Sequence, residues 1–370
     1  MKRILSVMLA IVMMVTMLPS NASAANGEND VLSNYKIVHY EDMSLMKART
    51  LESTIIVLDD KQLSDLGESV ADLFDSAEMV YVVTDKDSNY IQELCNMPAL
   101  MCYEEASESK FATAITKDKD GYYVYCDVSA IFEDNTKFSR TLNNTIDISE
   151  TQKINDGLVA VLRTSEELNT SGSKLARMQS SNFDAYGKDS AVIYNSSGER
   201  IGTMGYTMYT YKILKSGSTR IYDVITVATF APDSNSYCKK MSVYMGTTQA
   251  NHEVLEATPI VSHGSSKTHS LTLSKGKDGV SGEGSTSWSY TVDAQTVTKS
   301  FDMTTNDRTW TFQPKDPGKG DAWIEEPGVR FCATQNKIYT TVKLSCPSIG
   351  IFGIELSQNT LSKNWYTYYN

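Results

Sequence analysis

The sequence predicts an α+β chain of two domains, an N-terminal α/β domain followed by an all-β, sandwich-like C-terminal domain. Two observations support this fold class. In the first half, short apolar runs rich in β-branched residues alternate with stretches of helical spacing, in the order strand, helix, strand. In the second half, apolar and polar residues alternate with period two between Gly-rich turns, which is typical of antiparallel sheets.

The first 24 residues have the layout of a secretory signal peptide. Lys2 and Arg3 precede an apolar run of fifteen residues, 4–18, and small residues at 22–24 end the segment. A transmembrane anchor would need about 20 apolar residues to span the hydrocarbon. We therefore expect residues 1–24 to be removed and the chain to be secreted and extracellular, without a transmembrane anchor.

Length and charge indicate where the domains divide. Without the signal, 346 of the 370 residues remain, more than the ~250–300 that one core usually organises. Residues 25–184 contain 29 acidic and 14 basic side chains, whereas 185–370 contain 16 and 18. We expect an α/β domain at 25–168, a linker at 169–190 and a β domain at 191–370. The acidic excess argues against a nucleic-acid partner.

The α/β domain is expected to alternate buried strands with amphipathic helices. Its last helix has a capping box, Ser149 with Gln152 three residues on, and its hairpin turns at Asp120-Gly121. The expected elements are a strand at 53–58, a helix at 63–74, a strand at 79–83, a helix at 88–95, a hairpin of 111–116 with 122–128, and a helix from Ser149.

The β domain shows strand patterns only. The run 221–230 is apolar on both faces, as a central strand should be, and 337–344 alternates cleanly. Further strands are expected at 270–274 and 280–292. No stretch after residue 190 has helical spacing.

Four carboxylates mark the ends of the first two predicted strands. Asp59 and Asp60 follow the first strand, and Asp85 and Asp87 follow the second. Ligands of open α/β sheets bind beyond the carboxyl ends of strands, and clustered carboxylates there can hold Mg²⁺ or Ca²⁺. The alternative, which we favour, is that these residues cap helices and fill turns. No cofactor is expected unless these carboxylates bind a divalent cation.

Other catalytic patterns are incomplete. His252-Glu253 opens the zinc motif His-Glu-x-x-His, but Glu256 stands where the second His is required. Ser171 and Lys174 match Ser-x-x-Lys within the expected linker. Neither a Gly-x-Ser-x-Gly turn nor a Gly-rich phosphate loop is present in the sequence. The sequence therefore favours a protein that is not an enzyme.

Six cysteines stand at 95, 102, 126, 238, 332 and 346, and an extracellular compartment permits disulfides. Cys332 and Cys346 flank an expected hairpin, which makes them a candidate pair. Six cysteines allow 15 connectivities, so the pairing stays open.

The segment 280–312 combines Ser, Thr and Gly with regularly spaced aromatic residues. Trp288 and Tyr290 share one face of a strand whose other face is hydroxyl-rich, and Trp310 continues the alternation. The plainest interpretation is that the apolar face is sandwich core. Residues 280–292 are also long enough to cross a membrane as one strand, which needs about 9–11 residues, so 280–303 is a candidate membrane-inserting stem. In composition only, the segment resembles the Ser/Thr-rich stems of secreted β-structured toxins.

The patterns support three interpretations of function, in this order. The first is a secreted, non-catalytic binding protein for a protein or glycan, which presents Trp288, Tyr290, Trp310 and Trp323 on an exposed β-surface. The second is a secreted β-pore-forming toxin that inserts 280–303, the one case in which a membrane is a partner. The third is a metal-dependent enzyme in the N-terminal domain. Ligand identity and oligomeric state stay open.

Overall fold

The computed structural model describes most of the chain after the predicted signal peptide, which itself lies outside the described residues. The described ranges are 28–45, 53–99, 101–103, 109–118, 121–132, 148–170, 184–195, 197–233, 235–259, 267–276, 285–292, 295–300, 306–314, 318–349 and 355–369.

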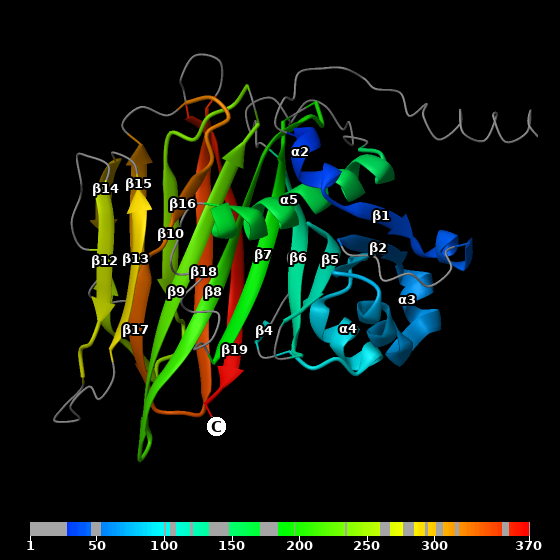
Figure 1. Ribbon diagram of the computed structural model, residues 1–370. Helices are drawn as coiled ribbons and strands as arrows, with labels where there is room; N and C mark the ends of the chain where they lie inside the picture. Colours follow the sequence, from blue (N-terminus) through cyan, green and yellow to red (C-terminus); the bar gives the residue numbers. More distant parts are fainter. Residues whose placement is uncertain are drawn as a thin grey trace, which may run out of the picture.

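One eleven-stranded mixed sheet runs through the molecule from end to end (Figure 1). Its order is β1-β2-β3-β5-β6-β7-β8-β9-β17-β11, and β16 pairs with β9 outside this path. The strands are β1 (Lys36–His39), β2 (Thr54–Asp59), β3 (Met79–Val83), β5 (Lys110–Lys117), β6 (Tyr123–Phe132), β7 (Ala185–Tyr194), β8 (Arg200–Ser216), β9 (Thr219–Pro232), β11 (His252–Thr258), β16 (Trp323–Glu325) and β17 (Gly328–Ala333).

The large sheet is continuous across the two halves of the sequence. β6 of the first half pairs in parallel with β7, which begins within the last residues of the expected linker. The α/β expectation holds locally, because β1, β2 and β3 are parallel neighbours with helices between them. The β-rich character is confirmed, but the arrangement of an α/β domain and a separate sandwich is not. Parallel pairing of β6 and β7 joins the two parts instead.

A six-stranded sheet packs against the C-terminal part of the large sheet. Its order is β14-β15-β10-β18-β19-β4. Trp310, Phe312, Phe331 and Trp365 lie in the core between the two sheets. The strands are β4 (Cys102–Tyr103), β10 (Met241–Gly246), β14 (Gln295–Ser300), β15 (Asp307–Pro314), β18 (Lys337–Ile349) and β19 (Glu355–Tyr368).

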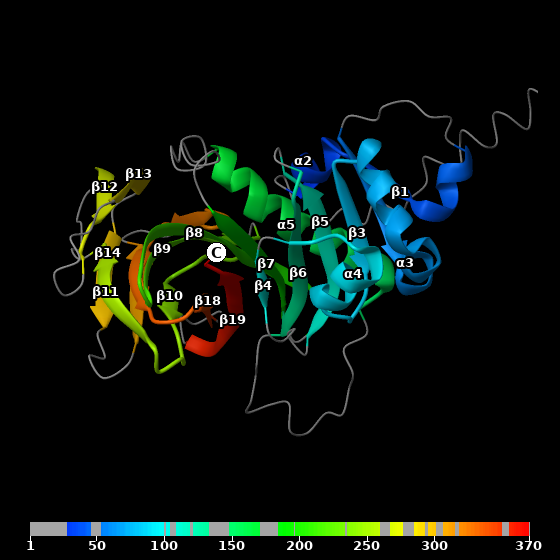
Figure 2. The same ribbon diagram turned by 90° about the horizontal axis from the view of Figure 1, so that it is seen from below.

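Helices cover the N-terminal part of the large sheet on both faces (Figure 2). Ser149 accepts a hydrogen bond from the backbone N–H of Gln152 at 3.2 Å, as the capping pattern predicts. The expected helix at 63–74 is interrupted at Gly67, whose φ of 51° ends the α-helix. The helices are α2 (Glu28–Ser33), α3 (Asp60–Leu66), α4 (Ser88–Cys95) and α5 (Glu150–Thr170), and the 3₁₀ helices are η1 (Tyr40–Leu45) and η2 (Gly67–Asp75).

The structure does not show the predicted disulfide between Cys332 and Cys346. Cys332 lies in β17 of the large sheet, and Cys346 lies in β18 of the six-stranded sheet. The chain between them crosses from one sheet to the other, so the hairpin that would have brought the two thiols together does not form.

Candidate functional site

A two-stranded sheet stands apart from the two large ones. β12 (Lys267–Leu273) and β13 (Thr286–Val292) pair antiparallel over seven positions, from Lys267 opposite Val292 to Leu273 opposite Thr286. Within the described residues this hairpin pairs with no other strand. Figure 2 shows it on the face of the large sheet that also carries α5. An isolated two-stranded hairpin is marginally stable in water, so its packing on this face holds it in place.

The hairpin packs on a small apolar area, which we call the seat. From the hairpin, Leu271, Leu273 and Trp288 are buried. Beneath them lie the seat residues of β8 and β9, namely Tyr211, Ile225 and Val227. Full burial of an apolar side chain is worth about 1.5–3 kcal/mol, so the three hairpin side chains supply much of the docking energy.

Trp288 packs directly on the backbone of β17. A Cβ at Gly328 would overlap the Trp288 ring and would come within 3.3 Å of Cδ1 of Leu273. Glycine is therefore required at position 328 for this close approach. The indole Nε1 of Trp288 donates to the carbonyl of Glu326 at 3.1 Å, which satisfies its polar atom in a buried position.

A row of three charges crosses the large sheet beneath the end of the hairpin. Arg330 of β17 stands in register with Glu256 of β11 on one side and with Asp223 of β9 on the other. The guanidinium donates to both oxygens of Asp223, at 2.6 and 2.8 Å, and both side chains are 0% exposed. Burial raises the pKa of Asp223, and the hydrogen bonds from Arg330 oppose this shift. We call these three residues the charged row.

The charged row also holds the hairpin by its backbone. Oε2 of Glu256 accepts the N–H groups of Ser274 at 2.7 Å and Lys275 at 2.9 Å, just beyond β12. Arg330 donates a longer hydrogen bond of 3.5 Å to the carbonyl of Lys275. Hydrogen bonds to a charged group are about twice as strong as neutral ones. The hairpin is therefore clamped just beyond the last residue of β12.

The four aromatic residues predicted as a binding face do not form an exposed row. Trp288 is 5% exposed, and Trp310 is 0% exposed with its Nε1 donating to the carbonyl of Pro259. Both rings are core, because the apolar faces of their strands turn toward a sheet. Trp323 is half-buried in β16. Tyr290 lies in β13 opposite His269.

One exposed tyrosine, Tyr368, and two half-buried ones, Tyr339 and Tyr366, lie instead on the outer face of the six-stranded sheet. Tyr339 is in register with Tyr366, and Lys337 with Tyr368. The Lys337 ammonium lies 3.9 Å from the centre of the Tyr366 ring and 5.0 Å from that of Tyr339, and Tyr368 is 54% exposed. We call these four residues the Tyr–Lys cluster. The alternation of 337–344 could have identified this outward face, since 338, 342 and 344 point inward.

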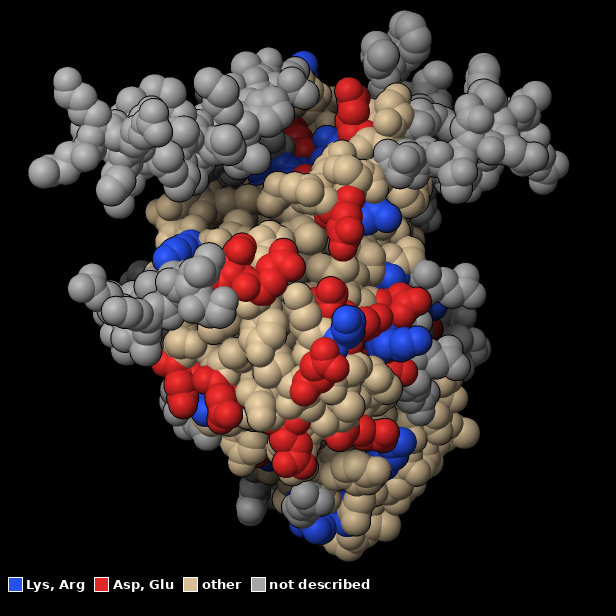
Figure 3. All heavy atoms as spheres, turned by 90° about the vertical axis from the view of Figure 1, so that its right-hand side faces the viewer, with Lys and Arg blue, Asp and Glu red and all other residues tan. Residues whose placement is uncertain are grey.

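The predicted strand-end carboxylates act as helix caps or lie in solvent. Asp59 caps α3 by accepting the N–H of Gln62 at 2.8 Å, and Asp87 caps α4 by accepting that of Tyr90 at 2.8 Å. Asp60 opens α3, and Asp85 is 78% exposed beside Lys86. Figure 3 looks onto this helical side and shows carboxylates scattered across it with basic side chains between them.

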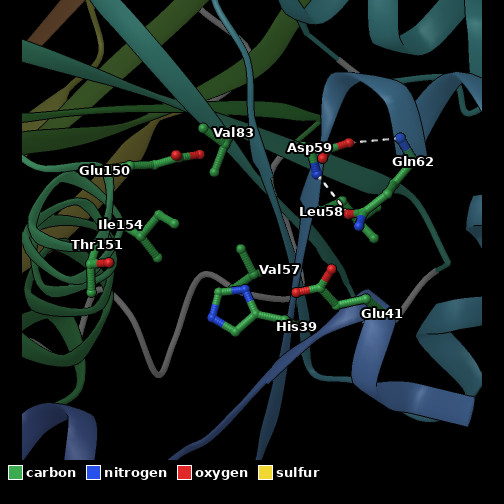
Figure 4. A pocket seen from close by; sticks show the side chains of 10 residues that line it. All are labelled: His39, Glu41, Val57, Leu58, Asp59, Gln62, Val83, Glu150, Thr151 and Ile154. Carbon is green, nitrogen blue, oxygen red and sulfur yellow. Dashed lines mark hydrogen bonds between the residues drawn. The ribbon is translucent and has the colours of Figure 1, made fainter. Parts of the chain in front are cut away.

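A cleft of about 260 Å³ lies at the carboxyl ends of β1, β2 and β3. Figure 4 shows His39 and Glu41 at one side of it, Asp59 bonded to Gln62, and Glu150 across the opening. Among the described residues, no three His, Cys, Asp or Glu side chains are grouped to hold a metal ion. A cation site at Asp59, Asp60, Asp85 and Asp87 thus stays a prediction from sequence.

No helix within the described ranges combines the length and apolar character needed to cross a bilayer.

Comparison with known proteins yields structural likenesses only. No family model matches the sequence, and no curated protein matches it. The chain is similar to the Clostridium perfringens delta-toxin, with 12% identity and a TM-score of 0.30, over 49% of this chain and 84% of the toxin. A structure named pore forming protein gives 10% identity and a TM-score of 0.27, over 49% and 86%. TM-scores below 0.5 do not define a shared fold, so these likenesses assign no activity to this chain.

Proposed function

We propose that this protein is a secreted β-pore-forming protein whose β12–β13 hairpin leaves the seat and enters a lipid bilayer. The observation that carries the proposal is that the hairpin pairs only with itself within the described chain. It can therefore leave without breaking the hydrogen-bond ladders of either large sheet. The exposed-aromatic binding interpretation has less support, because Trp288 and Trp310 are buried.

The sequence of the hairpin suits a strand that meets lipid on one side and water on the other. β12 reads KTHSLTL and β13 reads TSWSYTV, with apolar residues at alternate positions and no carboxylate in either strand. A carboxylate on the lipid face would oppose insertion. The bilayer buries the apolar side chains that the seat released, so the loss of docking energy is offset.

The proposed membrane segment differs from the one predicted from sequence. Residues 280–303 were expected to act together, but their described parts belong to two sheets: β13 pairs with β12, and β14 pairs with β15. The inserting hairpin in this proposal is therefore Lys267–Val292. β14 follows β13 after two residues and is an edge strand, so it is placed to join the inserting segment by losing one partner.

The Tyr–Lys cluster lies at the end of the molecule from which the hairpin would enter the bilayer, and this position supports the proposal. β12 runs in the same direction as β17, which goes from Gly328 to Ala333. Lys337 begins the strand after β17, so it lies at the end of the molecule toward which β12 runs. Figure 1 shows the C-terminus of the chain at this same end. Tyr and Lys side chains favour the interface between lipid and water, where ring and charge are both accommodated. A molecule resting on this cluster would direct the hairpin turn at the bilayer.

A reversible lock tests the proposal. In the wild type, the Glu256 side chain of β11 reaches the backbone of Ser274, just beyond the end of β12. In the double variant Glu256→Cys with Ser274→Cys, a disulfide would tie these two positions together. We expect the oxidised variant to release dye from phosphatidylcholine vesicles at least tenfold more slowly than the wild type, and reduction to restore release. Vesicles containing anionic lipid are assayed in parallel.

A matched control links the two strands of the hairpin to each other. Thr272 and Ser287 face one another with their hydroxyls 2.9 Å apart, so Thr272→Cys with Ser287→Cys should leave the hairpin free to move as a unit. We expect this variant to release dye in both redox states. The proposal fails if the oxidised Glu256–Ser274 lock leaves release unchanged, or if the wild type releases dye from neither vesicle type.

A further inference from the structure

A cluster of buried charges joins the two large sheets at a place remote from the hairpin. Lys363 of β19 places Nζ 2.9 Å from Oδ2 of Asp127 on β6 and 3.3 Å from Oδ1 of Asp189 on β7. β6 and β7 are parallel neighbours, with Asp127 and Asp189 directly in register. All three side chains are 1% exposed. An amine and two carboxylates thus share a site that excludes water.

The two carboxylates differ in their hydrogen bonds. Asp127 accepts from the hydroxyl of Tyr103 and from Oγ1 of Thr113 at 2.9 Å, and the ammonium of Lys110 lies 4.0 Å away. Burial would raise the pKa of Asp127, but Lys363, Lys110 and the hydroxyl of Tyr103 outweigh it and lower the pKa. Asp127 is therefore ionised.

Asp189 is the less stabilised acid of the pair. Its Oδ2 has no hydrogen-bond partner in the described part of the chain. Burial raises its pKa to about 7, with Lys363 opposing the shift. A large fraction of Asp189 is thus neutral at physiological pH, and a neutral carboxyl carbon accepts a nucleophile that a carboxylate repels.

Aromatic rings seal the site. The centre of the Tyr103 ring lies 3.8 Å from Nζ of Lys363, and that of Trp365 lies 5.4 Å away. Trp365 packs on the backbone at Gly187, where a Cβ would come within 2.8 Å of the ring, and its Nε1 donates to the hydroxyl of Tyr206 at 2.9 Å. Such a cover keeps water from hydrolysing a product formed beneath it.

We propose that Lys363 and Asp189 condense to an intramolecular amide, an isopeptide bond between β19 and β7, with Asp127 as the proton acceptor. This inference does not depend on the proposed pore-forming function. It assigns a covalent modification to side chains that already touch, and it needs no cofactor or co-reactant.

The reaction balances within the three side chains. The Lys363 ammonium gives one proton to the Asp127 carboxylate, and the free Nζ attacks Cγ of the neutral Asp189 carboxyl. The new C–N bond forms, the C–OH bond breaks, and the hydroxyl takes a second Nζ proton and leaves as water. One of the three Nζ protons stays on the amide and one on Asp127, so net charge is unchanged.

The geometry provides what this condensation requires. The proton transfer to Asp127 is necessary because the two carboxylates outweigh burial and raise the pKa of Lys363. The acceptor is only 2.9 Å away from Nζ. Groups held in contact react as if at an effective concentration of roughly 10⁵–10⁸ M. Asp127 then acts as the adjacent general base that frees the Lys363 amine for attack.

Peptide mapping of the full chain tests the proposal directly. Trypsin should release 189–200 and 344–363 as separate peptides from an unlinked chain, because Lys188, Arg200, Lys343 and Lys363 are cleavage sites. A linked chain resists cleavage at Lys363 and yields 189–200 joined to 344–370, lighter by one water than the sum of the two. Fragmentation must place the link at Asp189 and Lys363.

Variants define the roles of the three residues. Asp189→Ala and Lys363→Arg should each abolish the branched peptide, and Asp127→Asn should reduce its yield at least tenfold while leaving both reacting groups in place. The wild-type digest alone decides the proposal, so a variant that fails to fold does not obscure the result. Recovery of 189–200 and 344–363 as the major wild-type products would overturn it.

Discussion

Gly328 and Trp288 show how one missing side chain positions a whole hairpin. The indole ring lies against the β17 backbone at Gly328, and any Cβ there would displace it. The ring is also held by its hydrogen bond to the carbonyl of Glu326. Contact and hydrogen bond together make Trp288 the central anchor of the hairpin, although its spacing in the sequence is equally compatible with an exposed aromatic residue.

Protonation of the buried His252 affects the stability of the fold. This side chain is 2% exposed, its Nε2 accepts the backbone N–H of Tyr339 at 3.2 Å, and burial lowers its pKa to about 4. The folded state therefore keeps His252 neutral, whereas the unfolded chain takes up the proton near pH 6.5. Its contribution to stability is fully present above pH 6.5 and is lost as the pH falls toward 4.

We expect His252→Gln to flatten this part of the stability profile. The wild type should lose about 2–3 kcal/mol of unfolding free energy between pH 6.5 and 4 through this group. Gln keeps an acceptor for the Tyr339 N–H and does not titrate. Urea unfolding at both pH values measures the difference, with the exposed His39→Gln as control. An unchanged pH slope in His252→Gln would contradict the assignment.

At the scale of the element, the hairpin is held by one short apolar contact and one ionic clamp. The clamp is Glu256, which accepts two consecutive backbone N–H groups beyond β12. β11 contains an irregularity between Val254 and Glu256, which brings Glu256 into register with Arg330. A bulge in an edge strand thus directs the carboxylate toward the hairpin.

Replacing Glu256 by Gln should loosen the hairpin without unfolding the molecule. A neutral acceptor weakens hydrogen bonds that are worth about 1.5–3 kcal/mol when charged. We expect the amides of Ser274 and Lys275 to exchange with deuterium about tenfold faster, with little change in global stability. Glu253→Gln, at an exposed position of the same strand, serves as control. Equal exchange in the two variants would show that the clamp does not hold the hairpin.

At the scale of the whole molecule, the two large sheets are held to each other by far more contacts than hold the hairpin to its seat. β8 and β9 pair over fourteen positions, and the core between the two large sheets contains Trp310, Phe331 and Trp365. The hairpin has one ladder of seven pairs and its seat. The link between Lys363 and Asp189 that we propose would hold the two large sheets together while the hairpin leaves.

This difference predicts a stepwise opening in native-state hydrogen exchange. Amides of β12 and β13 should exchange through a partial opening with a lower free energy and a smaller denaturant dependence than those of β8 and β9. Exchange followed by mass spectrometry at low, increasing urea separates the two classes. If hairpin and central strands exchanged with one common free energy, release of the hairpin alone would be ruled out.

Much of the local structure was predictable because it depends on local chemistry. Period-two alternation identified β18, a continuous apolar run identified β9 as a central strand, and the pair Ser149 and Gln152 marked the start of α5. Each of these signals acts within a few residues, since the side chains of a strand alternate and the first N–H groups of a helix need acceptors.

Which strands pair, and which faces are covered, was decided by the tertiary structure alone. β13 pairs with β12 rather than continuing into β14, so the predicted stem is divided between two sheets. Lys363 meets Asp127 across 236 positions of the chain, and no local pattern carries that information. Alternation determines that a strand has two faces. What each face contacts is determined by the packing of segments that are distant in the sequence, and short-range alternation does not say which segments those are.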